Sequence, residues 1–135
     1  MMHQFKVKRN QQRQILTVFI RKVVLAADSE SAPGGPLQIG KTGLVSTDIA
    51  KAYYVKEGAA AAVLISAVAG TLGTWVSGGF VEVDATNMPG VYQFCPPNVV
   101  FAQGAKWVDI LLHFADATEA ESAQIHVETS RGGNA

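Results

Sequence analysis

Apolar and polar residues alternate most clearly in residues 77–94, SGGFVEVDATNMPGVYQF. The first half places the β-formers Phe80, Val81 and Val83 after a Gly-Gly pair, and the second half ends in the strictly alternating run YQF. Between them, the run NMPG has the composition of a turn. The segment therefore predicts a strand, a turn and a second strand.

A second β-like pattern occupies residues 13–25, RQILTVFIRKVVL. Alternation assigns its side chains to two faces, with Ile15, Thr17, Phe19 and Arg21 on one and Leu16, Val18, Ile20 and Lys22 on the other. A helix is the alternative, but Val18, Phe19 and Ile20 at its centre are poor helix formers. We therefore expect a long strand that is bent or bulged near Arg21.

Further segments complete the expected set of strands. Residues 50–55 and 60–68 are expected to form a hairpin around the KEG run, although the Ala-rich second segment also fits a helix. Residues 106–114 and 124–129 are expected to form two more strands, and residues 98–103 one helical turn with Asn98 as its N-cap. Seven or eight short strands at this spacing predict an all-β fold, an antiparallel β-sandwich of jelly-roll or immunoglobulin-like topology.

The chain is expected to hold one domain. It has 135 residues, of which 48% are hydrophobic and 16% charged, and folding at this size buries roughly two thirds of the surface of the unfolded chain. Residues 1–10 are expected to be a basic N-terminal arm, residues 11–130 the sandwich and residues 131–135 a flexible tail. The Pro- and Gly-rich residues 28–40 are expected to form a surface loop.

Several environments are disfavoured by the sequence. No run of about 18 apolar residues occurs, as a membrane span requires, and the start MMHQFKVKRN lacks the apolar stretch of a secretory signal. The single Cys95 has no partner for an internal disulfide. We therefore expect synthesis in the cytoplasm, with no membrane, nucleic acid or cofactor bound.

The 11 basic and 11 acidic residues cancel, but they are segregated along the chain. Every charged residue before the first acid, Asp28, is basic: Lys6, Lys8, Arg9, Arg13, Arg21 and Lys22. Acids dominate the other end: Asp109, Asp116, Glu119, Glu121 and Glu128. Such polarity is neutralised within one molecule, between identical neighbours or by an acidic partner, or it forms two solvated faces.

Residues 35–42, GPLQIGKT, satisfy the phosphate-loop pattern GxxxxGK[ST]. In a true phosphate loop, a strand precedes the pattern, a helix follows it, and backbone N–H groups wrap the phosphates. Here the preceding residues resemble a loop, Pro36 lacks an N–H, and Gly43 does not begin a helix. We therefore expect a loop that enters a strand, and no enzymatic activity.

Two other residue pairs suggest chemistry that simpler roles also explain. His113 and His126 would face each other if their hairpin centres near Glu119, but a metal site lacks a visible third ligand. Glu82 and Asp84 share a strand face like the paired acids of a glycosidase, although exposed surface charges explain them as well. We expect neither a catalytic nor a metal site.

The aromatic residues suggest two roles. Trp75, Trp107, Tyr53 and Tyr54 are suited to stacking on sugars, or else to filling the core or an interface. Tyr92 resembles a tyrosine corner, in which the hydroxyl returns to backbone near the crossing between two sheets.

The run GFVEVDATNMPGVYQF, preceded by AYYVKEGAA and followed by AQGAK, resembles small β-sandwich modules encoded in the virion structural genes of tailed bacteriophages and prophages. The resemblance covers residues 42–127 and the first strand at residues 12–25. It implies a structural virion protein without an active site and, for a chain of this length, a capsid decoration or cement protein. A neck, baseplate or tail-fibre component, or a carbohydrate-binding host-attachment module, is the alternative.

The resemblance also implies partners on the capsid exterior. These are the major capsid protein and further copies of the chain, in a homo-oligomer such as a dimer. Strand addition at an exposed sheet edge is the expected mode of contact. The expected partner-binding residues lie in or beside the basic arm: Phe5, Lys6, Lys8, Arg9 and Arg13.

Overall fold

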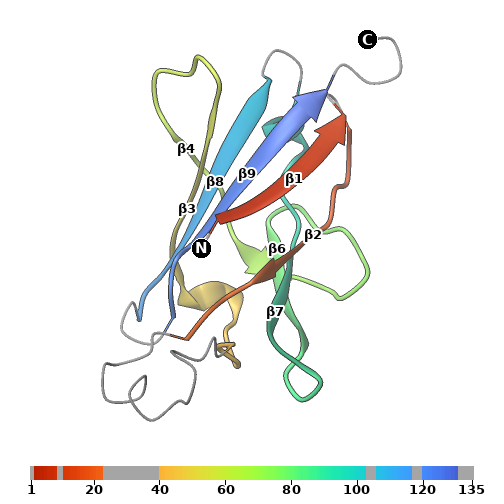
Figure 1. The fold of residues 1–135 in the computed structure, drawn as a ribbon, viewed down its shortest axis with the longest axis vertical. Coiled ribbons are helices and arrows are strands. Elements are labelled where there is room, and N and C mark those ends of the chain that lie inside the picture. The colour runs from red at the N-terminus through yellow and green to blue at the C-terminus, as the bar shows by residue number, and fades with distance from the viewer. Residues whose placement is uncertain (1, 9–10, 23–39, 103–105, 117–119, 131–135) are drawn as a thin grey trace, which may run out of the picture.

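In the computed structural model, the chain folds into two β-sheets packed face to face (Figure 1). The structure describes residues 2–8, 11–22, 40–102, 106–116 and 120–130. The elements follow in chain order as β1 (Met2–Lys8), β2 (Leu16–Phe19), the 3₁₀-helix η1 (Ser46–Asp48), β3 (Ile49–Lys56), β4 (Val63–Leu64), β5 (Val68–Ala69), β6 (Gly79–Asp84), β7 (Met88–Phe94), the 3₁₀-helix η2 (Asn98–Phe101), β8 (Trp107–Phe114) and β9 (Ala123–Ser130). The predicted all-β sandwich is confirmed, and these residues contain no α-helix.

The strand order identifies the topology. One sheet has the order β1-β9-β8-β3-β4, and the other has the order β2-β7-β6-β5. The runs β9-β8-β3-β4 and β2-β7-β6 correspond to strands G-F-C-C′ and B-E-D of an immunoglobulin-like sandwich, which separates the fold from a jelly roll. The sheets are mixed rather than purely antiparallel, because β1 runs parallel to β9 and β5 runs parallel to β6.

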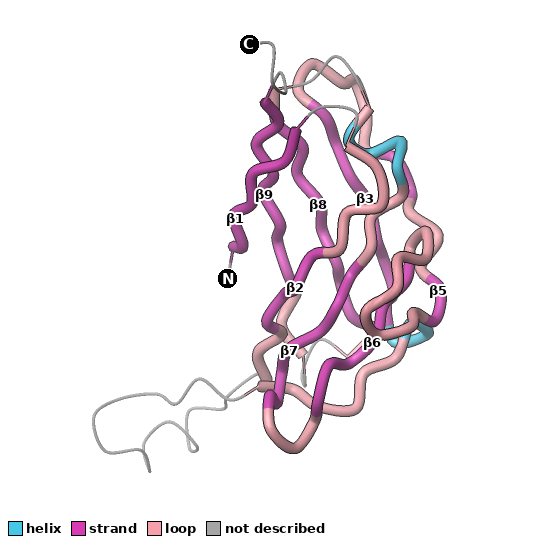
Figure 2. The backbone as a smooth tube through the Cα atoms, turned by 90° about the vertical axis from the view of Figure 1, so that its right-hand side faces the viewer, coloured by secondary structure: helices cyan, strands magenta, loops and turns pink. Residues whose placement is uncertain are grey.

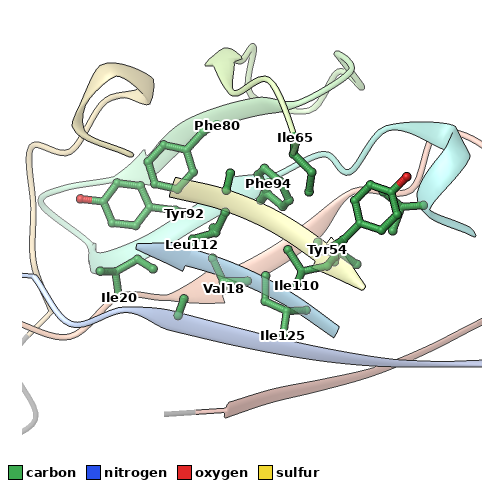
Figure 3. Packing of buried hydrophobic residues seen from close by; sticks show 14 of the residues in the cluster. Val18, Ile20, Tyr54, Ile65, Phe80, Tyr92, Phe94, Ile110, Leu112 and Ile125 are labelled. Carbon is green, nitrogen blue, oxygen red and sulfur yellow. The ribbon is translucent and has the colours of Figure 1, made fainter. Parts of the chain in front are cut away.

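Inward-facing side chains from both sheets fill the core (Figure 3). Phe80 on β6 and Tyr92 on β7 stack with their ring centroids 4.9 Å apart. Phe114, from the other sheet, lies 6.0 Å from Phe80 between ring centroids. The aromatic rings therefore join the two sheets at the centre of the sandwich.

Most predicted strands are confirmed, with changes at their boundaries. Residues 77–94 contain the β6–β7 hairpin, and residues 13–25 contain β2, which is shorter than expected. The hairpin predicted for residues 50–55 and 60–68 is confirmed as β3 and β4, but its second strand is wrong in extent, because the chain buries Ile65 in the core after β4 and then enters β5 in the other sheet. The N-cap role predicted for Asn98 is also wrong, because its Oδ1 accepts the backbone N–H of Arg13 at 2.7 Å.

Tyr92 connects the core to the crossing between the sheets. Its hydroxyl donates a hydrogen bond to the carbonyl oxygen of Lys41 at 2.6 Å and accepts one from the N–H of Leu44 at 3.2 Å. Both partners lie where the chain passes from β2 to β3, so the predicted return of this hydroxyl to backbone near a sheet crossing is confirmed. Burial raises the pKa of Tyr92 to about 12, and the hydroxyl therefore keeps its proton.

The expected N-terminal arm forms part of the sandwich. Residues 2–8 pair in parallel along β9, whereas the sequence analysis placed residues 1–10 outside the domain. The half-buried Phe5 and Val7 pack against the core, while the alternating Gln4, Lys6 and Lys8 are exposed. Nε2 of His3 accepts the backbone N–H of Phe19 at 2.9 Å. This contact joins β1 to β2, the edge strands of the two sheets on one side of the sandwich.

Gly90 on β7 lies so close to residues at and after the end of β2 that a side chain would not fit there. Its φ is +90°, and an added Cβ would lie 2.5 Å from the Cα of Gly40 and 2.8 Å from Cε1 of Phe19. We expect Gly90→Ala to lower the free energy of unfolding in urea by about 1–3 kcal/mol more than Gly58→Ala, because only Gly90 gains an overpacked contact. Gly58 is the matched control, since its φ is +80° and no atom lies within 4 Å of an added Cβ. Equal losses would contradict this role of the close approach.

The His3 contact predicts a pH-dependent contribution to stability. Burial lowers the pKa of His3 from its usual 6.5, because the charged ring loses hydration. The unfolded chain then binds more protons at this residue, so the stabilisation is complete above pH 6.5 and is lost as the pH falls through the folded-state pKa. We expect the free energy of unfolding to fall relative to that of His3→Gln between about pH 7 and about pH 5. The glutamine can accept the same N–H without titrating. If the difference in free energy of unfolding between the two proteins is independent of pH, the prediction is wrong.

Candidate interaction surfaces

The two long sides of the sandwich differ in chemistry. The edge strands β1 and β2 lie on one side, and the edge strands β4 and β5 lie on the other (Figure 2 shows β1 and β5 on opposite sides). We call the first the basic side, after the exposed Lys6, Lys8 and Arg13. We call the second the uncharged side. It is formed by residues 58–81, which include both of its edge strands, β4 and β5.

The predicted partner-binding residues divide on the basic side. Lys6 and Lys8 are exposed on β1, and Arg13 is exposed just before β2. Phe5 is half-buried and packs against the core, so its side chain serves the packing of the sandwich itself. Arg9 lies outside the described residues. The exposed cations therefore lie beside the free edge of β1.

Lysines on an edge strand restrict what that edge can pair with. They repel another basic strand and lose water without compensation against an uncharged one, which is how natural sheets protect their edges. An acidic surface is instead attracted. Part of the basic charge is already neutralised within the molecule, since Nε of Arg21 lies 3.5 Å from a carboxylate oxygen of Glu121. Lys6 already lies opposite Glu128 on β9, and Lys8 and Arg13 are the other exposed cations of the basic side.

The uncharged side exposes large apolar side chains. Residues 58–81 contain no Asp, Glu, Lys, Arg or His. The exposed fractions are 47% for Val63, 61% for Leu64, 40% for Val68 and 51% for Leu72. Scattered exposed apolar residues are ordinary, but several on one side with no charge among them are typical of an interaction surface. The β4 and β5 edges carry no lysine or proline, so their short length, two residues each, is what limits pairing with another strand.

The backbone of β4 is oriented toward a further strand. Leu64 lies opposite Tyr53 on β3, and the next residue, Ile65, donates its N–H to the carbonyl oxygen of Ala52 at 2.8 Å. Hydrogen-bonded and non-hydrogen-bonded pairs alternate along an antiparallel ladder, so the N–H and C=O of Leu64 point away from β3. This edge was not predicted from the sequence, although residues 58–81 lack charge in the sequence itself.

The outer face of the five-stranded sheet carries two polar pairs. Nδ1 of His126 lies 2.5 Å from Oδ1 of Asp109, and Nδ1 of His113 lies 2.8 Å from Oγ of Ser122. The predicted facing of His113 and His126 is wrong, because the register of β8 and β9 pairs His126 with Asp109. In the described part of the chain, no three His, Cys, Asp or Glu side chains group as metal ligands do.

The four aromatic residues suited to sugar stacking lie in different places. Tyr53 lines a hollow of about 320 Å³ on the outer face of the five-stranded sheet, and Trp107 stands beside His126 with ring centroids 6.2 Å apart. Tyr54 is buried in the core. Trp75 donates its indole N–H to the carbonyl oxygen of Pro96 at 3.2 Å. The four rings therefore form no common platform.

The two acids suggested as a reactive pair hold backbone instead. The carboxylate oxygens of Glu82 each accept the N–H of Gly43 at 3.3 Å. Asp84 accepts the N–H groups of Asn87 and Thr86 in the β6–β7 turn, and the hydrogen bonds from Asn87 hold the pKa of Asp84 below its usual value. Both carboxylates therefore have structural partners.

The phosphate-loop pattern lacks its structural context. Lys41 and Thr42 lead toward the 3₁₀-helix η1 and not into an α-helix, and residues 35–39 lie outside the described residues. Among the described residues, no helix has the length and apolar character that a membrane crossing needs.

Comparison with known proteins adds no identity. No protein-family model, curated protein or solved structure matches the chain.

Proposed function

We propose that the protein is a non-enzymatic structural protein of a tailed-bacteriophage virion, a decoration or cement protein that binds the outside of the capsid shell through protein–protein contacts. The observation that carries the proposal is the uncharged side, where exposed apolar side chains and a sheet edge without charge occur together. The resemblance of the sequence to virion β-sandwich modules supports the same class of function.

Two chemically distinct sides suit a protein that links neighbours. Apolar burial supplies affinity without strict direction, whereas exposed charge selects a complementary surface and speeds association. A cement protein needs both properties, because it must recognise an assembled shell and connect adjacent units. We assign the shell contact to the basic side, with an acidic surface of the major capsid protein as its partner.

The alternatives differ in what they require of these surfaces. A neck, baseplate or tail-fibre component would use the same two sides in another part of the virion. A host-attachment module would need a sugar site, and the scattered positions of Trp75, Trp107, Tyr53 and Tyr54 favour protein contacts over sugar stacking.

Charge reversal on the basic side tests the shell contact. The purified protein is mixed with capsid shells that lack it, the particles are sedimented, and bound copies are counted per major capsid subunit. We expect the native protein to saturate at a fixed ratio and to raise the melting temperature of the shell. Lys6→Glu/Lys8→Glu should weaken binding on the order of tenfold, because each exposed charge pair contributes roughly 0.2–1 kcal/mol and reversal adds repulsion. The loss should be largest at low ionic strength.

Lys51→Glu/Lys56→Glu is the matched control, since both lysines lie on β3, which β9 and β8 separate from β1. Substitution is preferable to deletion of residues 1–10, because deletion would remove β1 from its sheet. Equal losses in the two double variants would refute the role of the basic side. If the native protein shows no saturable binding, the cement proposal is wrong, and tail assemblies and then glycans become the partners to test.

A further inference from the structure

We propose that the uncharged side is a self-association surface, on which β4 pairs antiparallel with β4 of a second copy across a twofold axis at Leu64. The inference deepens the proposed function, on which it rests for its place in the virion. It names a second copy of the chain as the partner of this side, while the basic side stays free for the shell.

A second copy is the partner whose chemistry matches this side. Residues 58–81 carry no ionisable side chain, so β4 and its flanks need no counter-charge from a partner strand, although Lys51 and Lys56 lie on the neighbouring β3. Head-to-tail pairing of β4 with β1 would instead place Lys6 and Lys8 against an uncharged edge and remove their water without compensation. Charge therefore favours a closed twofold dimer over an open chain of copies.

The backbone of Leu64 fits a twofold axis. Its N–H and C=O point away from β3, toward the open edge of the sheet. In an antiparallel ladder, two residues that face each other as a hydrogen-bonded pair exchange both N–H···O=C bonds. With Leu64 on the axis, each copy donates to the other's carbonyl oxygen, and the five-stranded sheets of both copies become continuous.

Apolar side chains surround this axis. Val63 and Leu64 are the residues of β4, and Val68 and Leu72 belong to the same uncharged side. All four are exposed in the single chain, and a second copy brings its own Val63 and Leu64 to the axis. Pairing of the backbone thus coincides with removal of apolar surface from water, the largest favourable contribution to most protein associations.

The test is the mass of the full-length protein in solution, without shells, measured by light scattering and sedimentation equilibrium over a range of concentrations. We expect a reversible dimer. Leu64→Lys should raise its dissociation constant on the order of a hundredfold or more, because two like charges then face each other across the axis. Val99→Lys is the control, since Val99 is 55% exposed but lies in η2, outside the uncharged side.

A mixed sample makes the test independent of any loss of folding in one variant. Leu64→Lys and Leu64→Glu should each be monomeric, and their equimolar mixture should recover a dimer with opposite charges at the axis. A native monomer at all concentrations, or a dimer that Leu64→Lys leaves intact, would overturn the inference. A monomer that still saturates shells would overturn only the inference, whereas a dimer that binds no shell would overturn only the cement proposal.

Discussion

The stack of Phe80 on Tyr92 is the contact on which the rest of the structure depends. The ring of Tyr92 fills the core, while its hydroxyl holds the backbone of residues 41–44, where the chain leaves one sheet for the other. A buried hydroxyl without partners is costly, so this ring determines where the crossing must pass and where β3 begins. Because β3 pairs with β8 on one edge and β4 on the other, both outer surfaces follow from that position.

Alternation predicted the strands that lie within one sheet, and it failed where the chain changes sheets. The strand–turn–strand order of residues 77–94 was predictable from two β-like runs flanking turn residues, but the turn forms at residues 85–87 and most of the run NMPG belongs to β7. Ile65 lies in a continuous apolar run, and a pattern of burial does not record which sheet a residue joins. Residues 3–8 do alternate, but their lysines are equally typical of a solvated arm. They form a strand because β9, from the far end of the chain, pairs with them.

The candidate surfaces were predictable only in part. The sequence identified Lys6 and Lys8 as candidates, since clustered charge is visible without structure. It did not predict that Phe5 faces the core, because that orientation depends on pairing between residues far apart in the chain. The uncharged side could be identified only from the topology, because a segment without charge affects strand pairing only where it forms an exposed sheet edge.

Ile65 gives the uncharged side a mechanical connection to the interior. It lies between β4 and β5, is buried in the core and bonds through its N–H to Ala52 on β3. Because Ile65 directly follows β4, separating β4 from β3 would also expose a core residue to water. Such an edge is a preorganised template that loses little conformational freedom on binding. A strand bound at this edge should consequently raise the free energy of unfolding of the whole molecule.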